Sequence, residues 1–336
     1  MSRQPAIPLF ALAALVSCLA GCGRSDRSET TSVSAGARTP VVSGTTSDSA
    51  GASGETAIPP KAVTYERAES TYAAGAYPEA SGLFSSYTES NPENPWGHYM
   101  LGLSAWKSGD RERALSAFDR SLELDSSHRK SLFNSSRVLL EMGRPQEALS
   151  RIEQALTQEP MSNEGLRLLG RTQYQLGKVD DAIEAYRRAL VVDDEDVWSL
   201  NNLGLIYLDQ NRSSEALPPL ARAVQLKGNS PVFQNNLGTS LERSGYPVAA
   251  AEAYEAAIKV DSTYQKASVA LARVTGSGQQ PESEPIDLAE LAQRFQSEIE
   301  SARGDSAADS VQSVSDSTTS SIEAVGDTVE NSDHGE

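Results

Sequence analysis

The sequence predicts an all-α protein, a superhelical solenoid of six helix-turn-helix repeats with a C-terminal capping helix, flanked by disordered segments. Three observations support this prediction. The middle of the chain divides into repeats of 34 residues that follow one another without an insertion, as 61–94, 95–128, 129–162, 163–196, 197–230 and 231–264. Counted from the first residue of each repeat, position 20 is Ala in all six, and position 15 is Gly in five and Asn in the other. The two ends of the chain are rich in Ser, Thr, Gly and Asp and contain few large apolar side chains.

The first element, residues 1–21, is predicted to be an export signal. An apolar run from Ala6 to Leu19 follows Arg3; it is short for a bilayer span and is followed by small residues. The next residues, Ala20-Gly21-Cys22, complete a stretch that resembles the lipobox of bacterial lipoproteins. That resemblance implies cleavage before Cys22, lipid on its sulfur and stable attachment through several acyl chains. An ordinary secretory peptide with a chance cysteine is the alternative.

The location follows from the same resemblance. Asp after the lipidated cysteine would favour retention in the inner membrane, but Gly23 stands there. We therefore expect a lipid-anchored protein of the bacterial cell envelope, on the outer membrane and facing the periplasm.

The flanking segments are predicted to be disordered, because they cannot bury enough apolar surface to offset the chain entropy. Residues 22–60 would form a tether that begins at the lipidated cysteine, and residues 304–336 an acidic tail. The only cysteines are Cys18 and Cys22, so the exported part has no disulfide and no cysteine metal ligand. The net charge of −17 argues against nucleic acid as a partner.

Each repeat is predicted to contain two helices joined by a tight turn at position 15, where Gly and Asn tolerate the left-handed conformation. Position 8 is small and position 24 is large and apolar, so the two helices can approach closely. These positions and the 34-residue period resemble the tetratricopeptide repeat family over about 204 residues. The resemblance implies a solenoid whose concave groove binds extended peptides. One departure, Pro218-Pro219, is expected to bend the second helix of the fifth repeat.

Two further helices are predicted after the repeats. Residues 265–274 would cap the last repeat, so that the solenoid with its cap spans 61–274. A linker at 275–285 separates it from an amphipathic helix at 286–303, with Leu288, Leu291, Phe295 and Ile299 on one face. This helix either packs against the open end of the solenoid or stays loose, or it docks in the protein's own groove and competes with partners.

The candidate partner site lies on the first helix of each repeat, at positions 2, 5, 6, 9, 12 and 13, opposite the core leucines and glycines. The motif Asn-Asn-Leu-Gly occurs at Asn201 and again at Asn235, and its carboxamides could pair with a peptide backbone. Aromatic and basic side chains on the same face favour a partner with an acidic patch. The alternative is that the arginines pair along their own helices and the aromatic rings pack between repeats. The predicted groove residues are Trp96, Tyr99, Lys130, Phe133, Asn134, Arg137, Arg167, Arg171, Tyr174, Trp198, Asn201, Asn202, Asn235 and Asn236.

No enzyme site is readable in the sequence. His98, His128 and His334 form no zinc-binding pair, and neither a glycine-rich phosphate loop nor a serine-nucleophile elbow occurs. We therefore expect a scaffold, without cofactor or metal, that binds peptide or protein partners. Two alternatives are a pilotin-like lipoprotein that assists secretin assembly in pilus or secretion systems, and an adaptor for envelope hydrolases or outer-membrane assembly machinery. The oligomeric state stays open.

Overall fold

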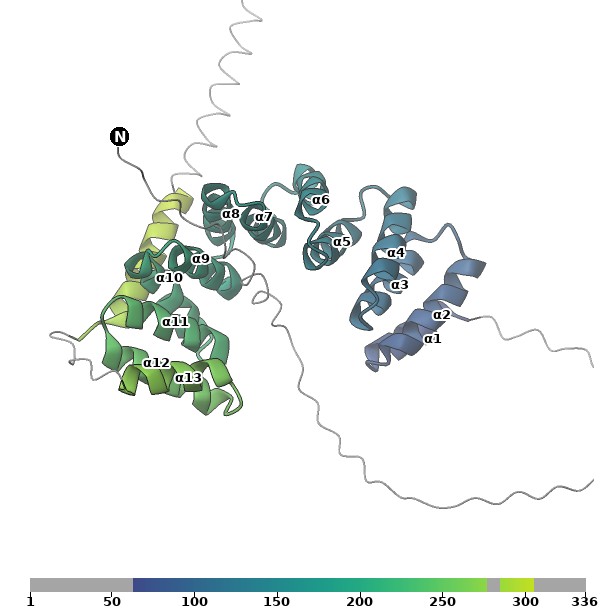
Figure 1. The fold of residues 1–336 in the computed structure, drawn as a ribbon. Coiled ribbons are helices and arrows are strands. Elements are labelled where there is room, and N and C mark those ends of the chain that lie inside the picture. The colour runs from purple at the N-terminus through teal and green to yellow at the C-terminus, as the bar shows by residue number, and fades with distance from the viewer. Residues whose placement is uncertain (1–62, 277–284, 305–336) are drawn as a thin grey trace, which may run out of the picture. The chain divides into compact units, whose positions relative to one another are not determined.

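The protein is described by a computed structural model for residues 63–276 and 285–304 (Figure 1). The predicted export signal, Cys22, the predicted tether, most of the predicted linker and nearly all of the predicted acidic tail lie outside the described residues. Within the described residues all regular structure is helical, which confirms the predicted fold class. No helix in these two stretches is long and apolar enough to cross a bilayer.

Twelve helices form six consecutive pairs, one pair for each predicted repeat. A further helix, α13 (Gln265–Gly276), follows the last pair, and the C-terminal helix spans residues 288–304. Helix α10 continues through Pro218 and Pro219 as one element. The pairs are α1 (Tyr65–Ala73) and α2 (Tyr77–Ser90), α3 (Pro95–Lys107) and α4 (Arg111–Leu124), α5 (Arg129–Glu141) and α6 (Pro145–Gln158), α7 (Asn163–Gln175) and α8 (Val179–Val192), α9 (Val197–Asp209) and α10 (Ser213–Leu226), and α11 (Pro231–Arg243) and α12 (Pro247–Val260).

The turn inside each repeat depends on the residue at position 15. All six of these residues have a positive φ, and the one that is not glycine, Asn211, has φ 58°. This confirms the sequence prediction, because Asn is the residue other than Gly that most readily adopts the left-handed conformation.

The start of the first helix depends on position 34 of the preceding repeat in every repeat but the first, where Thr64 caps α1. The Asn94 side chain accepts hydrogen bonds from the backbone N–H groups of Trp96 and Gly97, and the Asp196 side chain accepts one from that of Trp198. Ser162 and Ser230 cap α7 and α11 in the same way. These side chains satisfy N–H groups that would otherwise lack a partner in the first turn.

The two helices of a repeat lie very close together where position 8 faces position 24. A Cβ added to Gly102 would lie 2.6 Å from the Phe118 ring, and one added to Gly204 would lie 2.4 Å from Cγ of Leu220. The packing therefore leaves no space for a methyl group at these glycines unless the neighbouring side chain moves.

The solenoid has two different faces. Each odd-numbered helix from α1 to α13 approaches the next odd-numbered helix, whereas no even-numbered helix approaches the next even-numbered one. The stack therefore curves with the odd-numbered helices inside. We call the surface formed by the odd-numbered helices the inner face and that formed by the even-numbered helices the outer face.

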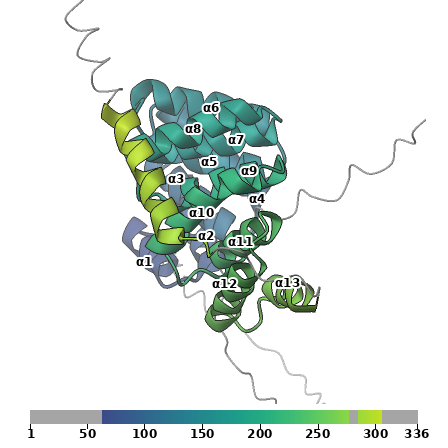
Figure 2. The same ribbon diagram turned by 90° about the vertical axis from the view of Figure 1, so that its left-hand side faces the viewer.

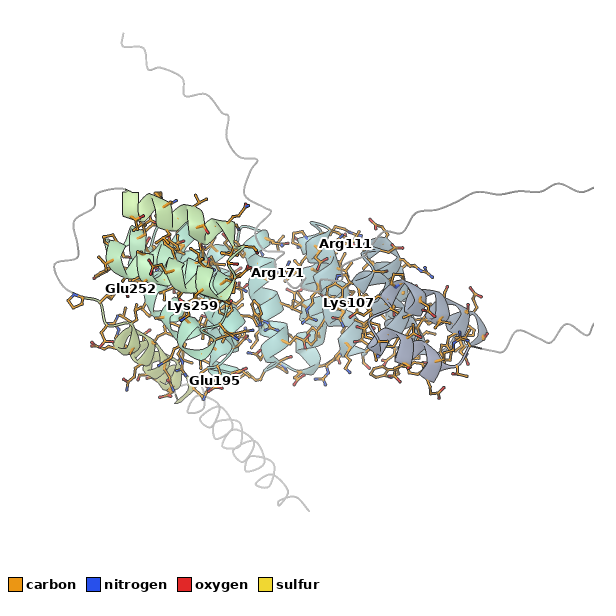
Figure 3. All side chains as sticks on the ribbon, turned by 90° about the horizontal axis from the view of Figure 1, so that it is seen from below. Lys107, Arg111, Arg171, Glu195, Glu252 and Lys259 are labelled. Atoms are coloured by element: carbon orange, nitrogen blue, oxygen red, sulfur yellow. The ribbon has the colours of Figure 1, made fainter. Side chains whose placement is uncertain are left out.

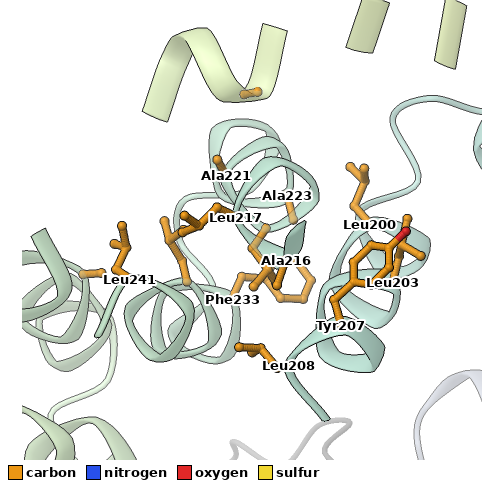
Figure 4. Close-up of a cluster of buried hydrophobic side chains, with 14 of the residues drawn as sticks. Leu200, Leu203, Tyr207, Leu208, Ala216, Leu217, Ala221, Ala223, Phe233 and Leu241 are labelled. Carbon is orange, nitrogen blue, oxygen red and sulfur yellow. The ribbon is translucent and has the colours of Figure 1, made fainter. Parts of the chain in front are cut away.

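The C-terminal helix packs on the outer face, beside α8 and α10 (Figures 1 and 2). Ala292, Phe295 and Ile299 are buried in the same apolar cluster as Leu217 and Ala221 of α10, and Figure 4 shows Ala221 on the side of α10 toward this helix.

Arg303 attaches the C-terminal end of this helix to the solenoid, and Asp287 determines where the helix starts. Arg303 donates hydrogen bonds to the backbone oxygen of Val191 at 2.7 Å and to Asp194 at 2.8 Å. The helix starts two residues later than predicted because the Asp287 side chain caps it by accepting from the N–H groups of Ala289 and Glu290. Both predicted positions are wrong, because the helix covers neither the open end of the solenoid nor its inner face.

Candidate functional site: the inner face

The predicted groove residues differ widely in exposure. Tyr99, Phe133 and Asn201 are buried, at 7%, 5% and 4% exposure. Trp96 and Trp198 are exposed, at 46% and 39%, and Lys130 is exposed as well. The other predicted groove residues are half-buried: Asn134, Arg137, Arg167, Arg171, Tyr174, Asn202, Asn235 and Asn236.

A regular set of hydrogen bonds joins neighbouring repeats across the inner face. The two residues of each pair lie 35 apart in the sequence, so position 5 of one repeat meets position 6 of the next, and position 12 meets position 13. The Asn134 amide donates to the Tyr99 hydroxyl at 3.2 Å, and the Tyr174 hydroxyl donates to Asp209. Likewise, Trp106 Nε1 donates to Glu141 at 3.2 Å. Burial raises the pKa of Tyr99 to about 12, so its hydroxyl keeps its proton at neutral pH.

The two Asn-Asn-Leu-Gly motifs take part in this set. The Nδ2 of Asn236 donates to the Oδ1 of the buried Asn201 at 2.8 Å. Asn202 hydrogen-bonds the Tyr186 hydroxyl, whose pKa burial raises. The expectation that Asn201 is free for a ligand is therefore wrong, because the second motif's amide already occupies its oxygen. Asn235 occupies the position in the last repeat that Asn201 occupies in the fifth. The residue 35 positions after Asn235 is Ala270 of α13, which has no polar side chain.

Two of the predicted basic residues are already paired within the protein. Arg137 contacts Glu164 of the next repeat at 2.5 Å and Asn134 at 2.9 Å. Arg167 contacts the buried Asp196 at 3.2 Å. The predicted alternative of pairing along the same helix is thus wrong in detail: Arg137 pairs with a residue of α7, and Arg167 pairs with the residue that caps α9.

Arg171 of α7 differs from these two arginines (Figure 3). No carboxylate of the described residues lies within ion-pair distance of it, and its buried Nε has no hydrogen-bond partner. It lies near the Tyr186 hydroxyl. Burial raises the pKa of that hydroxyl, and the smaller effect of the Arg171 charge lowers it. A half-buried guanidinium without an internal anion is suited to bind a carboxylate from outside.

Trp96 lies in a cluster of aromatic and basic side chains at the start of α3. Its ring is T-shaped to that of His128, with 4.5 Å between centroids, and Lys130 Nζ lies 5.3 Å from the ring centroid. His128 is buried, and its Nδ1 accepts from the N–H of Ser131, which caps α5. Burial lowers the pKa of His128, an effect that Asp125 opposes and Lys130 reinforces. The neutral imidazole therefore packs against an indole that is still 46% exposed.

Trp198 has the same position in its repeat, three repeats later. Its ring is T-shaped to that of Phe233, with 5.3 Å between centroids, and Lys227 Nζ lies 5.2 Å from the indole centroid. An ammonium group at this distance from an indole face is attracted by the ring quadrupole. The inner face thus carries two exposed tryptophans, each with a lysine over its ring.

A comparison with family models identifies the repeats. The model described as "Tetratricopeptide repeat" matches residues 99–141, 133–197 and 167–232. The chain is a tetratricopeptide repeat protein. Tetratricopeptide repeat proteins bind peptides and proteins and are generally non-catalytic scaffolds, and this one is accordingly a scaffold for protein–protein interaction.

Several solved structures are similar to this chain. The Cut9–Hcn1 heterotetramer of the APC/C is similar with a TM-score of 0.54 and 16% identity, over 62% of this chain and 41% of that chain. A tetratricopeptide repeat protein from Parabacteroides merdae has a TM-score of 0.52 and 12% identity, over 62% and 82%. One from Thermus thermophilus has a TM-score of 0.47 and 19% identity, over 54% and 99%. No curated protein matches the sequence.

The hydrogen-bonded pairs of this tetratricopeptide repeat protein have a sequence signal that the repeat-by-repeat reading missed. Complementary side chains recur at a spacing of 35, one more than the period, as in Asn201 with Asn236 and Tyr174 with Asp209. Because neighbouring first helices are tilted against each other, a residue of one helix faces the residue 35 positions later, one more than the repeat length. Polar residues with such a partner are structural, and those without one remain candidates for binding.

A hollow of about 810 Å³ lies away from the inner face, mostly along α4. Leu115 and Met142 contribute apolar surface to it, and several of its charged residues are already paired: Arg120 pairs with Glu123, and Arg144 and Asp119 have partners as well. The inner face, with Arg171 and the two tryptophans, is therefore the stronger candidate site.

Proposed function

We propose that this tetratricopeptide repeat protein is a lipid-anchored scaffold of a bacterial cell envelope, which binds an extended acidic segment of a partner protein on its inner face. The observation that supports the binding mode is Arg171, a half-buried cation of the inner face that no carboxylate of residues 63–276 and 285–304 neutralises. Desolvation strengthens its attraction for an anion, and a guanidinium can hold a carboxylate through two parallel hydrogen bonds.

The membrane part of the proposal is supported by sequence. The stretch Leu19-Ala20-Gly21-Cys22 after an apolar run would direct lipid to the Cys22 sulfur. Outer-membrane attachment follows from Gly23 in place of Asp. The acidic nature of the partner is supported by the cations Lys130 and Arg171 of the inner face. The exposed Glu66 and Glu69 of α1 would repel an anion and confine it to the later repeats.

The anchor is tested by labelling cells with a radioactive or alkyne-bearing fatty acid. The full-length chain is expected to become labelled and to sediment with outer membranes, whereas Cys22→Ser is expected to stay unlabelled. An unlabelled wild-type protein that is released to the soluble periplasm would refute lipid anchoring and leave the binding mode open.

The binding mode is tested by affinity capture from detergent-solubilised envelopes with the full-length protein and with Arg171→Glu. The matched control is Arg113→Glu, which makes the same charge change at an exposed site on α4. Partners retained by the wild type and by the control, but lost from Arg171→Glu, would support the proposal. Identical partners on all three proteins would refute it, and a secretin among the captured proteins would favour the pilotin alternative.

A further inference from the structure

The inner face carries two exposed tryptophans with a lysine over each ring; Lys130 comes from α5, and Lys227 directly follows α10. Trp96 and Trp198 are both at position 2 of their repeats, both are exposed, and each has a lysine ammonium about 5 Å from its ring centroid. Position 2 shares a helical stripe with position 9, which holds Arg171, because residues seven apart on a helix lie on one side. Trp96, Trp198 and Arg171 therefore lie on one surface.

The cations of this surface lack anions of their own. Among residues 63–276 and 285–304, no carboxylate lies within ion-pair distance of Lys130, Lys227 or Arg171, whereas Arg137 and Arg167 are paired. Each exposed indole is supported from behind, Trp96 by His128 and Trp198 by Phe233, so it offers a fixed apolar surface. Fixed aromatic rings with an adjacent cation favour a bulky apolar side chain beside a carboxylate.

We propose that the inner face recognises an extended segment with two bulky apolar side chains about eight residues apart, each beside an acidic residue, with a further acidic residue between them. This inference rests on the proposed function and specifies its ligand. The spacing follows from the fold. Neighbouring packed helices lie about 9 Å apart, so three repeats separate the tryptophans by about 27 Å, and an extended chain advances about 3.3 Å per residue.

The spacing is tested with immobilised palindromic peptides of the form Ser-Glu-Phe-(spacer)-Phe-Glu-Ser, because a palindrome reads the same in both chain directions. The spacer contains Ser, with one central Glu, and places the two Phe from four to fourteen residues apart. The full-length protein is expected to bind best at a separation of about eight. Equal binding at every separation would overturn the proposal.

The anchors are tested on the best peptide. Trp96→Ala and Trp198→Ala are each expected to lower the affinity by about tenfold or more, since exposed aromatic anchors dominate such interfaces. Lys130→Gln and Lys227→Gln, which remove no packed side chain, are expected to lower it by about twofold to fivefold. Val248→Ala is the matched control, because Val248 is a 47% exposed apolar residue of α12 on the outer face.

The outcomes separate this inference from the proposed function. If peptide binding is lost in Arg171→Glu but unchanged in Trp96→Ala and Trp198→Ala, the role of the two tryptophans is refuted. The proposed binding of an acidic segment would then remain supported. No binding to any peptide of the series would also overturn this inference, while the capture of partners through Arg171 would still decide the proposed function. Circular dichroism of each variant shows whether the repeats remain folded, and the lysine variants give an answer even if a tryptophan variant does not fold.

Discussion

The hydrogen bond between Asn236 and Asn201 provides a direct test of what the two Asn-Asn-Leu-Gly motifs do. Asn201 is only 4% exposed, and its Oδ1 accepts from Asn236 Nδ2 at 2.8 Å. Asn236→Ala removes the donor and leaves a buried acceptor where water has little access. We expect a loss of about 1–3 kcal/mol in the free energy of unfolding, the usual cost of a buried polar group without its partner.

The matched control is Asn235→Ala in the same motif. Asn235 is also half-buried, but no side-chain partner faces it from α13, so its replacement is expected to change stability by less than about 0.5 kcal/mol. The double variant Asn201→Ala/Asn236→Ala should cost clearly less than the sum of the two single variants, with a coupling of about 1 kcal/mol.

The assay is urea unfolding at neutral pH, followed by circular dichroism and by the fluorescence of the tryptophans. Coincident transitions from the two probes would justify a single free energy for each variant. Equal losses in Asn236→Ala and Asn235→Ala, or strictly additive losses in the double variant, would refute the structural role. In that case the paired amides would again be candidates for ligand binding.

Three further predictions concern other parts of the fold. Because burial lowers the pKa of His128, the folded state favours the neutral imidazole. The contribution of His128 to the free energy of unfolding is therefore complete above the unfolded pKa of about 6.5, and it is lost as the pH falls toward the lowered pKa of the folded state. Thermal unfolding between pH 7.5 and 5.5 should therefore weaken the wild type more than His128→Asn, which keeps a capping side chain, and parallel profiles would contradict this. Ala221→Glu should release the C-terminal helix, because it places a carboxylate in the apolar cluster that buries this helix. Mass spectrometry should then find faster tryptic cleavage at Arg294, and unchanged cleavage would show that this cluster does not hold the helix. Asn211→Ala should cost about 1 kcal/mol in urea unfolding, because φ is 58° there, whereas Asn211→Gly should not destabilise the protein; the reverse order would be inconsistent with the turn.

The position of the C-terminal helix could have been inferred from one further sequence comparison. Position 25 is charged in the second, third, fourth and sixth repeats, at Asp119, Glu153, Arg187 and Glu255, but in the fifth it is Ala221. The structure buries that alanine beneath the helix. The first repeat has the polar Ser85 there, so Ala221 is the one apolar residue at this position. An apolar residue among charged and polar ones indicates a covered surface, although the pattern does not say what covers it.

The sequence by itself determined the repeats of this protein, because local chemistry specifies them. A residue that tolerates positive φ is needed at every position 15, and a small residue is needed wherever Phe118 or Leu220 fills the space between two helices. Both requirements recur at a period of 34 and can be read without knowing any contact between repeats. The order and type of the helices follow directly.

Only the tertiary structure decided which polar residues of the inner face are free. Asn201 and Asn235 occupy the same letter of the same motif, yet one is buried against Asn236 and the other meets no side-chain partner. Arg137 and Arg171 likewise share position 9, yet only Arg137 finds a carboxylate. The difference lies in the side chain that the next repeat presents one position further along, and that depends on how two helices 35 residues apart are tilted and packed.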